Sequence, residues 1–184
     1  MAVSLGPSGL SGDGGGVLVS SGSMSDLGYS GAQTSDVDIP LPTGYDFFKV
    51  LISFRCAGAG LTRNIVFFQV KDSGGTRLST ETNSWIMRRS GSVTQEYNSA
   101  GTWTRLGSFV DDVNFNHVEF TVNGKYGSRP GVTWTGNHTY GSVGSSMFIG
   151  STHYNSVTQY RSIGLNADNG SIDLFQYRVI GYPT

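Results

Sequence analysis

Residues Tyr45–Arg55 have the sequence YDFFKVLISFR, in which large side chains recur at every second position. One face of an extended chain then carries only large apolar groups, those of Phe48, Val50, Ile52 and Phe54. The opposite face is mixed, with Lys49, Ser53 and Arg55 beside Phe47 and Leu51. A period of two with aromatic and β-branched residues is typical of a strand with one buried face. This stretch therefore predicts a β-strand.

Further strands are expected at residues 65–71, 118–123, 147–154, 160–165 and 171–182. At 118–123 the alternation is clear, because Val118, Phe120 and Val122 alternate with Glu119, Thr121 and Asn123. We expect the strands at 147–154 and 160–165 to pair, and the last strand to place Phe175, Tyr177 and Val179 on one face. Turn residues separate the strands, at 72–75 (DSGG), at Asn123-Gly124 as a hairpin-type pair, and at 168–170 (DNG).

The fold class follows from the many short strands and from the lack of a helical pattern. Apolar residues do not hold helical spacing over three turns anywhere without a glycine. Short strands separated by Gly, Asn and Ser turns predict an all-β, antiparallel β-sandwich of jelly-roll-like form, with a barrel as the alternative. A length of 184 residues suits one such domain.

The first 35 residues differ in composition from the rest. They contain nine Gly, nine Ser, two charged residues and one aromatic, whereas all 12 Lys and Arg follow them. We therefore predict an extended N-terminal docking arm over residues 1–35 and a β-sandwich body over residues 36–184. Apolar residues spaced along the arm are its predicted docking anchors, namely Val3, Leu5, Leu10, Val17, Leu18, Val19, Leu27 and Tyr29.

Composition excludes several functional classes. The net charge of −1 provides no general attraction to nucleic acid or to an anionic membrane, and no apolar run is long enough to insert as a helix. A single cysteine, Cys56, rules out an internal disulfide and a cysteine metal cage, and we expect it to be buried. No signal peptide is recognisable.

No catalytic, cofactor or metal site can be assembled from the sequence. The three histidines, His117, His138 and His153, lie outside any metal-binding motif. The adjacent pair Asp111-Asp112 would point to opposite faces of a strand, so its carboxylates cannot act together on one sugar. We therefore expect a protein that is not an enzyme and that binds no metal or cofactor.

Binding is better supported than catalysis. Tyrosine and tryptophan are frequent in the second half of the chain, and both combine an apolar body with a polar tip that suits interfaces and sugar stacking. We expect residues 91–103 and 132–154 to contribute binding loops. The candidate receptor or subunit contacts are Trp103, Trp134, Tyr140 and Tyr154. Residues 85–89 (WIMRR) are a candidate seam between subunits, or else an ordinary strand.

Several short motifs resemble those of a group of small tailed-phage proteins. Residues 36–42 (DVDIPLP), followed by Gly44-Tyr45, are similar to the segment that leads into the first long strand of that group. Residues 70–76 (VKDSGGT) resemble its second turn. Residues 169–172 (NGSI), leading to 179–182 (VIGY), resemble its closing strand, with Gly-Tyr in place of Tyr-Gly.

The resemblance implies a jelly-roll protein of the phage virion surface, typically a homotrimer, made in the host cytoplasm. A tail-fibre or receptor-binding module would attach through its arm to other virion proteins and contact a host glycan or protein. A capsid decoration protein would instead bind the lattice of the major capsid protein. A third alternative is a stand-alone carbohydrate-binding or hydrolytic domain, which would need aromatic residues and converging acids.

Overall fold

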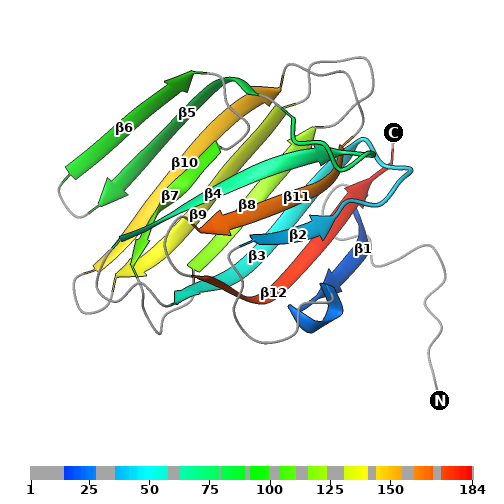
Figure 1. Ribbon diagram of the computed structural model, residues 1–184, viewed down its shortest axis with the longest axis horizontal. Coiled ribbons are helices and arrows are strands. Elements are labelled where there is room, and N and C mark those ends of the chain that lie inside the picture. Colours follow the sequence, from blue (N-terminus) through cyan, green and yellow to red (C-terminus); the bar gives the residue numbers. More distant parts are fainter. Residues whose placement is uncertain are drawn as a thin grey trace.

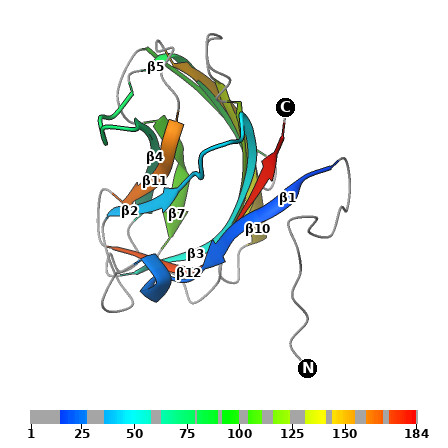
Figure 2. The ribbon, with the colours of Figure 1, turned by 90° about the vertical axis from the view of Figure 1, so that its right-hand side faces the viewer.

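The computed structural model describes residues 15–27, 36–57, 63–78, 80–89, 92–99, 104–110, 116–123, 131–140, 144–154, 160–167 and 171–183. These residues form twelve strands and one short 3-10 helix, η1, at Ser25–Leu27. The strands are arranged in two antiparallel sheets, and Figure 2 shows the larger sheet curving around the smaller one. The all-β sandwich predicted from the sequence is therefore confirmed.

The larger sheet has eight strands. Their order across the sheet is β1 (Val17–Gly22), β12 (Ser171–Tyr182), β3 (Phe47–Ala57), β8 (Asn116–Asn123), β9 (Gly131–Tyr140), β10 (Gly144–Tyr154), β5 (Thr80–Arg89) and β6 (Ser92–Ser99). Figure 1 shows β1 at one end of this sheet and β6 at the other.

The smaller sheet has four strands, in the order β2 (Asp36–Pro40), β11 (Tyr160–Ala167), β4 (Arg63–Asp72) and β7 (Thr104–Val110). From β2 to β5 the chain changes sheet at every connection, and it does so again on either side of β7 and β11. This alternation is the wrapping expected of a jelly roll. Among the described strands none pairs across the two sheets, so the barrel alternative is not realised.

The hydrophobic core lies between the sheets. In β3 the four apolar residues of the predicted inner face, Phe48, Val50, Ile52 and Phe54, are all buried. From the smaller sheet, Phe68 packs edge-on against Phe120 and Trp134, with ring centroids 5.1 and 4.8 Å apart. Aromatic pairs in this geometry add to the stabilisation from burial alone. The core therefore joins β4 of one sheet to β8 and β9 of the other.

The turn after β4 follows its sequence closely. The Asp72 side chain accepts hydrogen bonds from the backbone N–H groups of Gly74 and Thr76 at 2.8 and 2.9 Å. The N–H of Gly75 donates to the carbonyl of Asp72, and Gly75 has a φ of 78°, a conformation that glycine adopts without a steric penalty. The turn predicted at residues 72–75 is confirmed.

Two expectations about pairing need correction. The strands at 147–154 and 160–165 do not pair, because β10 lies in the larger sheet and β11 in the smaller one. The partners β8 and β9 are joined by residues 124–130, with Asn123 opposite Gly131, rather than by a two-residue turn. In β12, Tyr177 and Val179 are both buried on one face, as expected, whereas the side chain of Phe175 lies outside the described ones.

The arm and the body are not separate over the described part of the arm. Residues Val17–Gly22 form β1, which pairs with β12 in an antiparallel manner, and Met24 is buried in the core. The boundary predicted after residue 35 therefore separates residues 17–27 from the body, although these residues pack against it. Val3, Leu5, Leu10 and Tyr29 lie outside the described residues.

Candidate binding surface

The outer face of the larger sheet carries the side chains of β3, β8, β9 and β10 that do not enter the core. Several of them are polar and exposed or half-buried, namely Ser53, His117, Thr121, Asn123, Thr133, Thr135 and Asn137, and the half-buried Lys49, Leu51, Arg55 and Glu119 lie on the same face. Register places several of them directly opposite one another, with Thr121 beside Thr133 and His117 beside Asn137. Hydroxyl and amide groups both donate and accept hydrogen bonds, so this face can bind a polar ligand of either kind.

Two exposed apolar side chains stand among these polar groups. Met147 and Ile149 on β10 are 58% and 56% exposed, while Phe148 between them is buried. They lie opposite Asn137 and Thr135 of β9, and Ile149 is also paired with Ile86 of β5. Large apolar groups rimmed by polar residues are typical of interaction surfaces. We call Thr133, Thr135, Asn137, Met147 and Ile149 the β9–β10 face.

The polar contacts on this sheet are of modest strength. Lys49 Nζ lies 3.3 Å from Glu119 Oε1, with both side chains more than a third exposed, so solvent screens the pair and limits it to about 0–1 kcal/mol. Ser53 Oγ and His117 Nδ1 are 2.8 Å apart.

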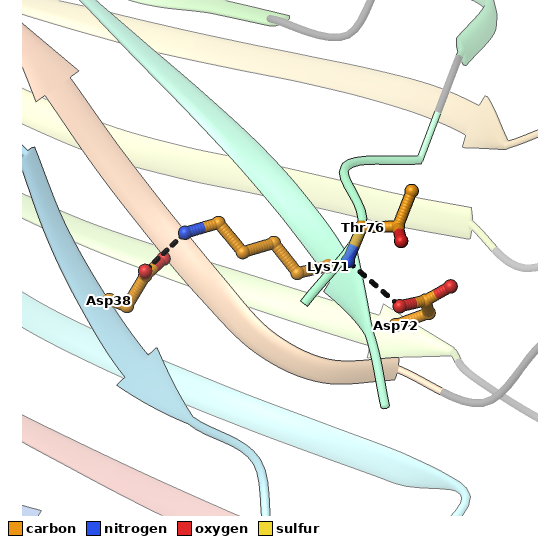
Figure 3. A network of polar contacts seen from close by, with 4 residues as sticks. All are labelled: Asp38, Lys71, Asp72 and Thr76. Carbon is orange, nitrogen blue, oxygen red and sulfur yellow. Dashed lines mark hydrogen bonds and ion pairs between the residues drawn. The ribbon is translucent and has the colours of Figure 1, made fainter. Parts of the chain in front are cut away.

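A second polar network lies on the outer side of the smaller sheet. The Lys71 ammonium of β4 reaches across β11 and forms an ion pair with the Asp38 carboxylate of β2 (Figure 3). Gly164 of β11 permits this contact, because a Cβ there would lie 2.5 Å from Asp38 Oδ1 and 3.2 Å from the Gln69 side chain. The ion pair therefore joins β2 to β4 across the intervening β11.

Within the described ranges, no three His, Cys, Asp or Glu residues are placed to hold a metal ion. Cys56 is buried, as expected from its position in β3. Asp111-Asp112 lies outside the described residues, as does the side chain of His138. No helix in the described part of the chain has the length and apolar character needed to span a membrane.

Two of the four predicted contact residues are core residues. Trp134 and Tyr154 are 2% and 0% exposed, so the prediction that they contact a receptor or a subunit is corrected. Trp134 packs on Phe68, and Tyr154 packs on Tyr160 with ring centroids 5.7 Å apart. Burial raises the pKa of the Tyr154 and Tyr160 hydroxyls, so both phenols stay neutral. Trp103 and the Tyr140 side chain lie outside what is described.

The expected binding loops are largely strands. Residues 132–154 span most of the β9–β10 hairpin, and residues 92–99 form the edge strand β6. Residues 85–89 belong to β5, the strand between β10 and β6, and their side chains are not described. The sequence signal for this surface is the run Met147-Phe148-Ile149. Three consecutive apolar residues in a strand place apolar side chains on both faces, so at least one of them points away from the core.

The described arm anchors contact the chain's own body. Val19 and Leu27 are half-buried and pack against the core, whereas Leu18 is 57% exposed. Val17 is half-buried in β1. The carboxylate of Asp26 accepts hydrogen bonds from the Ser23 N–H and hydroxyl, both at 2.7 Å, and these bonds lower its pKa. The described segment is thus a strand and a short turn docked on the sandwich.

Comparison with known proteins gives few matches. No family model matches the chain, and no curated protein matches it. Among solved structures, the chain is similar to the CBM2 module of the evolved Dit protein of Lactobacillus casei BL23 phage J-1. That match has 10% sequence identity and a TM-score of 0.30, and it covers 81% of this chain and 70% of the other.

Proposed function

We propose that the chain is a non-enzymatic protein of the bacteriophage virion surface, of the tail-fibre or receptor-binding type. The proposal combines the sequence motifs that resemble small tailed-phage proteins with the surface of the sandwich. One observation carries the binding role, namely the exposed Met147 and Ile149 within a polar sheet face. A regular sheet holds such side chains at fixed spacings, which suits recognition of a repeating surface ligand.

The ligand is proposed to be a host-surface glycan or protein. Threonine and asparagine side chains provide hydrogen bonds to hydroxyl or amide groups, and the two apolar side chains provide a patch for an apolar face of the ligand. The sheet beneath is anchored to the core through Trp134 and Phe148, both buried. The face is therefore preorganised, which limits the entropy lost on binding.

The test measures binding of the purified full chain to host cells. We expect Ile149→Arg to reduce binding at least about tenfold, because it replaces an exposed apolar contact with a long charged side chain. The matched control is Thr76→Arg, which introduces the same group in the exposed turn after β4. Equal binding by both variants and the unmodified chain would contradict the proposed surface. Hydrolysis of a host polysaccharide by the pure chain would contradict the non-enzymatic assignment.

A capsid decoration protein is the second candidate. It is favoured by the N-terminal segment, since the edge of β1 that faces away from β12 has no partner among the described strands, and Val3, Leu5 and Leu10 precede it in the sequence. An edge strand with apolar residues beside it can add to a sheet of another protein. Deletion of residues 1–14 leaves β1 and Met24 in place, so loss of the chain from particles would then report on attachment rather than on folding.

A further inference from the structure

A row of residues with two aromatic rings crosses the larger sheet at the beginning of β3. Tyr182 of β12 is opposite Phe47 of β3, and Phe47 is opposite Asn123 of β8. Asn123 is in turn opposite Gly131 of β9, and Gly131 is opposite His153 of β10. The five strands are neighbours in the sheet (Figure 1). We call these five residues the aromatic row.

The aromatic row lies on the outer face of the sheet. Residues adjacent to it in the chain, such as Phe48 and Val122, are buried in the core, and neighbours in a strand point to opposite faces. Asn123 and His153 are exposed, and the two aromatic side chains are half-buried. Both polar groups and part of the aromatic surface are therefore accessible to a ligand.

The two aromatic rings form one end of the row. The ring centroids of Phe47 and Tyr182 are 5.4 Å apart, and the ring planes meet at 78°, so one ring packs edge-on against the other. The face of an aromatic ring is slightly negative and attracts C–H groups that are slightly positive. Because each ring holds the other in place, little freedom is lost when a ligand binds there. This end suits the apolar C–H face of a ligand.

The polar end of the row is arranged around a glycine. A Cβ at Gly131 would lie 3.5 Å from His153 Cδ2 and 3.7 Å from its Nε2, so the imidazole leans toward β9. Asn123 lies on the other side of β9, two strand spacings or about 9–10 Å from His153. Amide and imidazole groups both donate and accept hydrogen bonds, and no side chain at position 131 separates them. Both can therefore contact one hydroxyl-bearing ligand.

The row is uncharged. None of its five residues is Asp, Glu, Lys or Arg. On the same face, the ammonium of Lys49 and the carboxylate of Glu119 pair with each other. Such a surface provides no net Coulomb attraction to phosphate or carboxylate groups. The charge of the row therefore matches a neutral ligand.

The row is continuous with the β9–β10 face. Gly131 precedes Thr133 by two residues on β9, and His153 follows Ile149 by four residues on β10. Four residues of a strand extend over about 13 Å. A ligand that contacts both the aromatic rings and Ile149 is therefore an extended chain of several units.

We propose that the ligand of this surface is a neutral glycan. One sugar ring packs on Phe47 and Tyr182, its hydroxyls bond to Asn123 and His153, and further sugars follow the β9–β10 face. The inference rests on the proposed function, from which it takes the host surface as the source of the ligand, and it selects a glycan over a protein. Protein interfaces of standard size bury about 800 Å² per partner around an apolar core. The outer face is instead mostly polar among the described residues.

The first experiment separates a glycan ligand from a protein ligand. The labelled full chain is added to host cells that are untreated, treated with periodate, which cleaves the vicinal diols of sugars, or treated with protease. We expect periodate to remove most of the binding and protease to leave it unchanged. Loss after protease with none after periodate would overturn the glycan ligand and leave the proposed function intact. A lack of binding to untreated cells would contradict the proposed function and this inference together.

The second experiment tests the row itself. We expect Asn123→Ala and His153→Ala each to weaken binding to untreated cells about tenfold, because each removes a hydrogen-bonding group. Phe47→Leu keeps an apolar side chain but removes the ring, and it should weaken binding by a similar factor. The matched control is Gln176→Ala, which removes an exposed amide of β12 outside the row. Denaturant unfolding of each variant checks that the fold is kept. Binding by all three variants equal to that of the control would overturn the assignment of the sugar to this row.

Discussion

The core around Phe68 and the docked segment 15–27 both make apolar contacts, but they differ in how deeply they are buried and in how many strands they contact. Phe68 is fully buried and contacts rings from two different strands of the facing sheet. The docked segment buries Met24, half-buries Val19 and Leu27, and pairs with a single strand. We therefore expect the core to unfold together with the whole chain and the segment to open separately from it.

The largest effect is expected for Phe68→Ala. Removal of the ring leaves a cavity between Phe120 and Trp134, and such truncations cost about 3–5 kcal/mol. Denaturant unfolding should show this loss in the free energy of the whole chain. The control Thr135→Ala changes an exposed residue and should stay within about 0.5 kcal/mol. A loss below 1 kcal/mol for Phe68→Ala would mean that the core is not shared between the sheets.

Gly136→Ala should have the next largest effect. A Cβ at Gly136 would lie 2.4 Å from both the His117 carbonyl and the Phe148 ring, so β9 would have to shift against β8. Overpacking of this kind costs about 1–3 kcal/mol. On the same strand, Gly131→Ala has no atom nearer than 3.5 Å and should be close to neutral. Equal unfolding free energies for the two variants would contradict the close packing at Gly136.

Met24→Ala tests the docked segment directly. The truncation weakens docking, so amide hydrogen exchange in β1 should accelerate about tenfold, while exchange in β3 and β8 stays unchanged. Leu18→Ala is the control within the segment, because Leu18 is 57% exposed. Equal acceleration in β1, β3 and β8 would show that the segment and the core form one cooperative unit.

The smallest effect is expected from a fall in pH, measured as amide hydrogen exchange in β1. The pKa of Asp26 lies below its ordinary value of 3.8 because its carboxylate accepts hydrogen bonds from Ser23. The stabilisation of the turn is therefore complete above pH 3.8 and is lost as the pH falls through the lowered pKa of the folded chain. Exchange in β1 should accelerate over that range relative to the core, and Asp26→Asn should remove this difference. Persistence of the pH dependence in Asp26→Asn would assign it to another group.

The strands were predictable because their signals are local. β3 and β8 alternate with period two, and Asp72 and Gly75 specify the turn after β4. Pairing was less predictable. The strands β10 and β11 are neighbours in sequence but belong to different sheets, and a jelly roll pairs strands that are distant in the chain.

The candidate surface was the least predictable part. Trp134 and Tyr154 are of residue types that often make binding contacts, yet both side chains point into the core. The exposed positions of this part of the sheet are instead occupied by Met147 and Ile149. Residue type alone does not decide this, since aromatic residues serve both cores and interfaces. The face of a strand is decided by register against its neighbours.

The amino-acid sequence by itself determined the all-β class, the positions of the main strands and the uncharged N-terminal segment, because alternation, turn chemistry and composition act over a few residues. Only the tertiary structure decided that β1 docks on β12, that Met24 enters the core and that Met147 and Ile149 remain outside. These outcomes depend on contacts between strands far apart in the chain, so their physical cause lies in the packing of the whole sandwich.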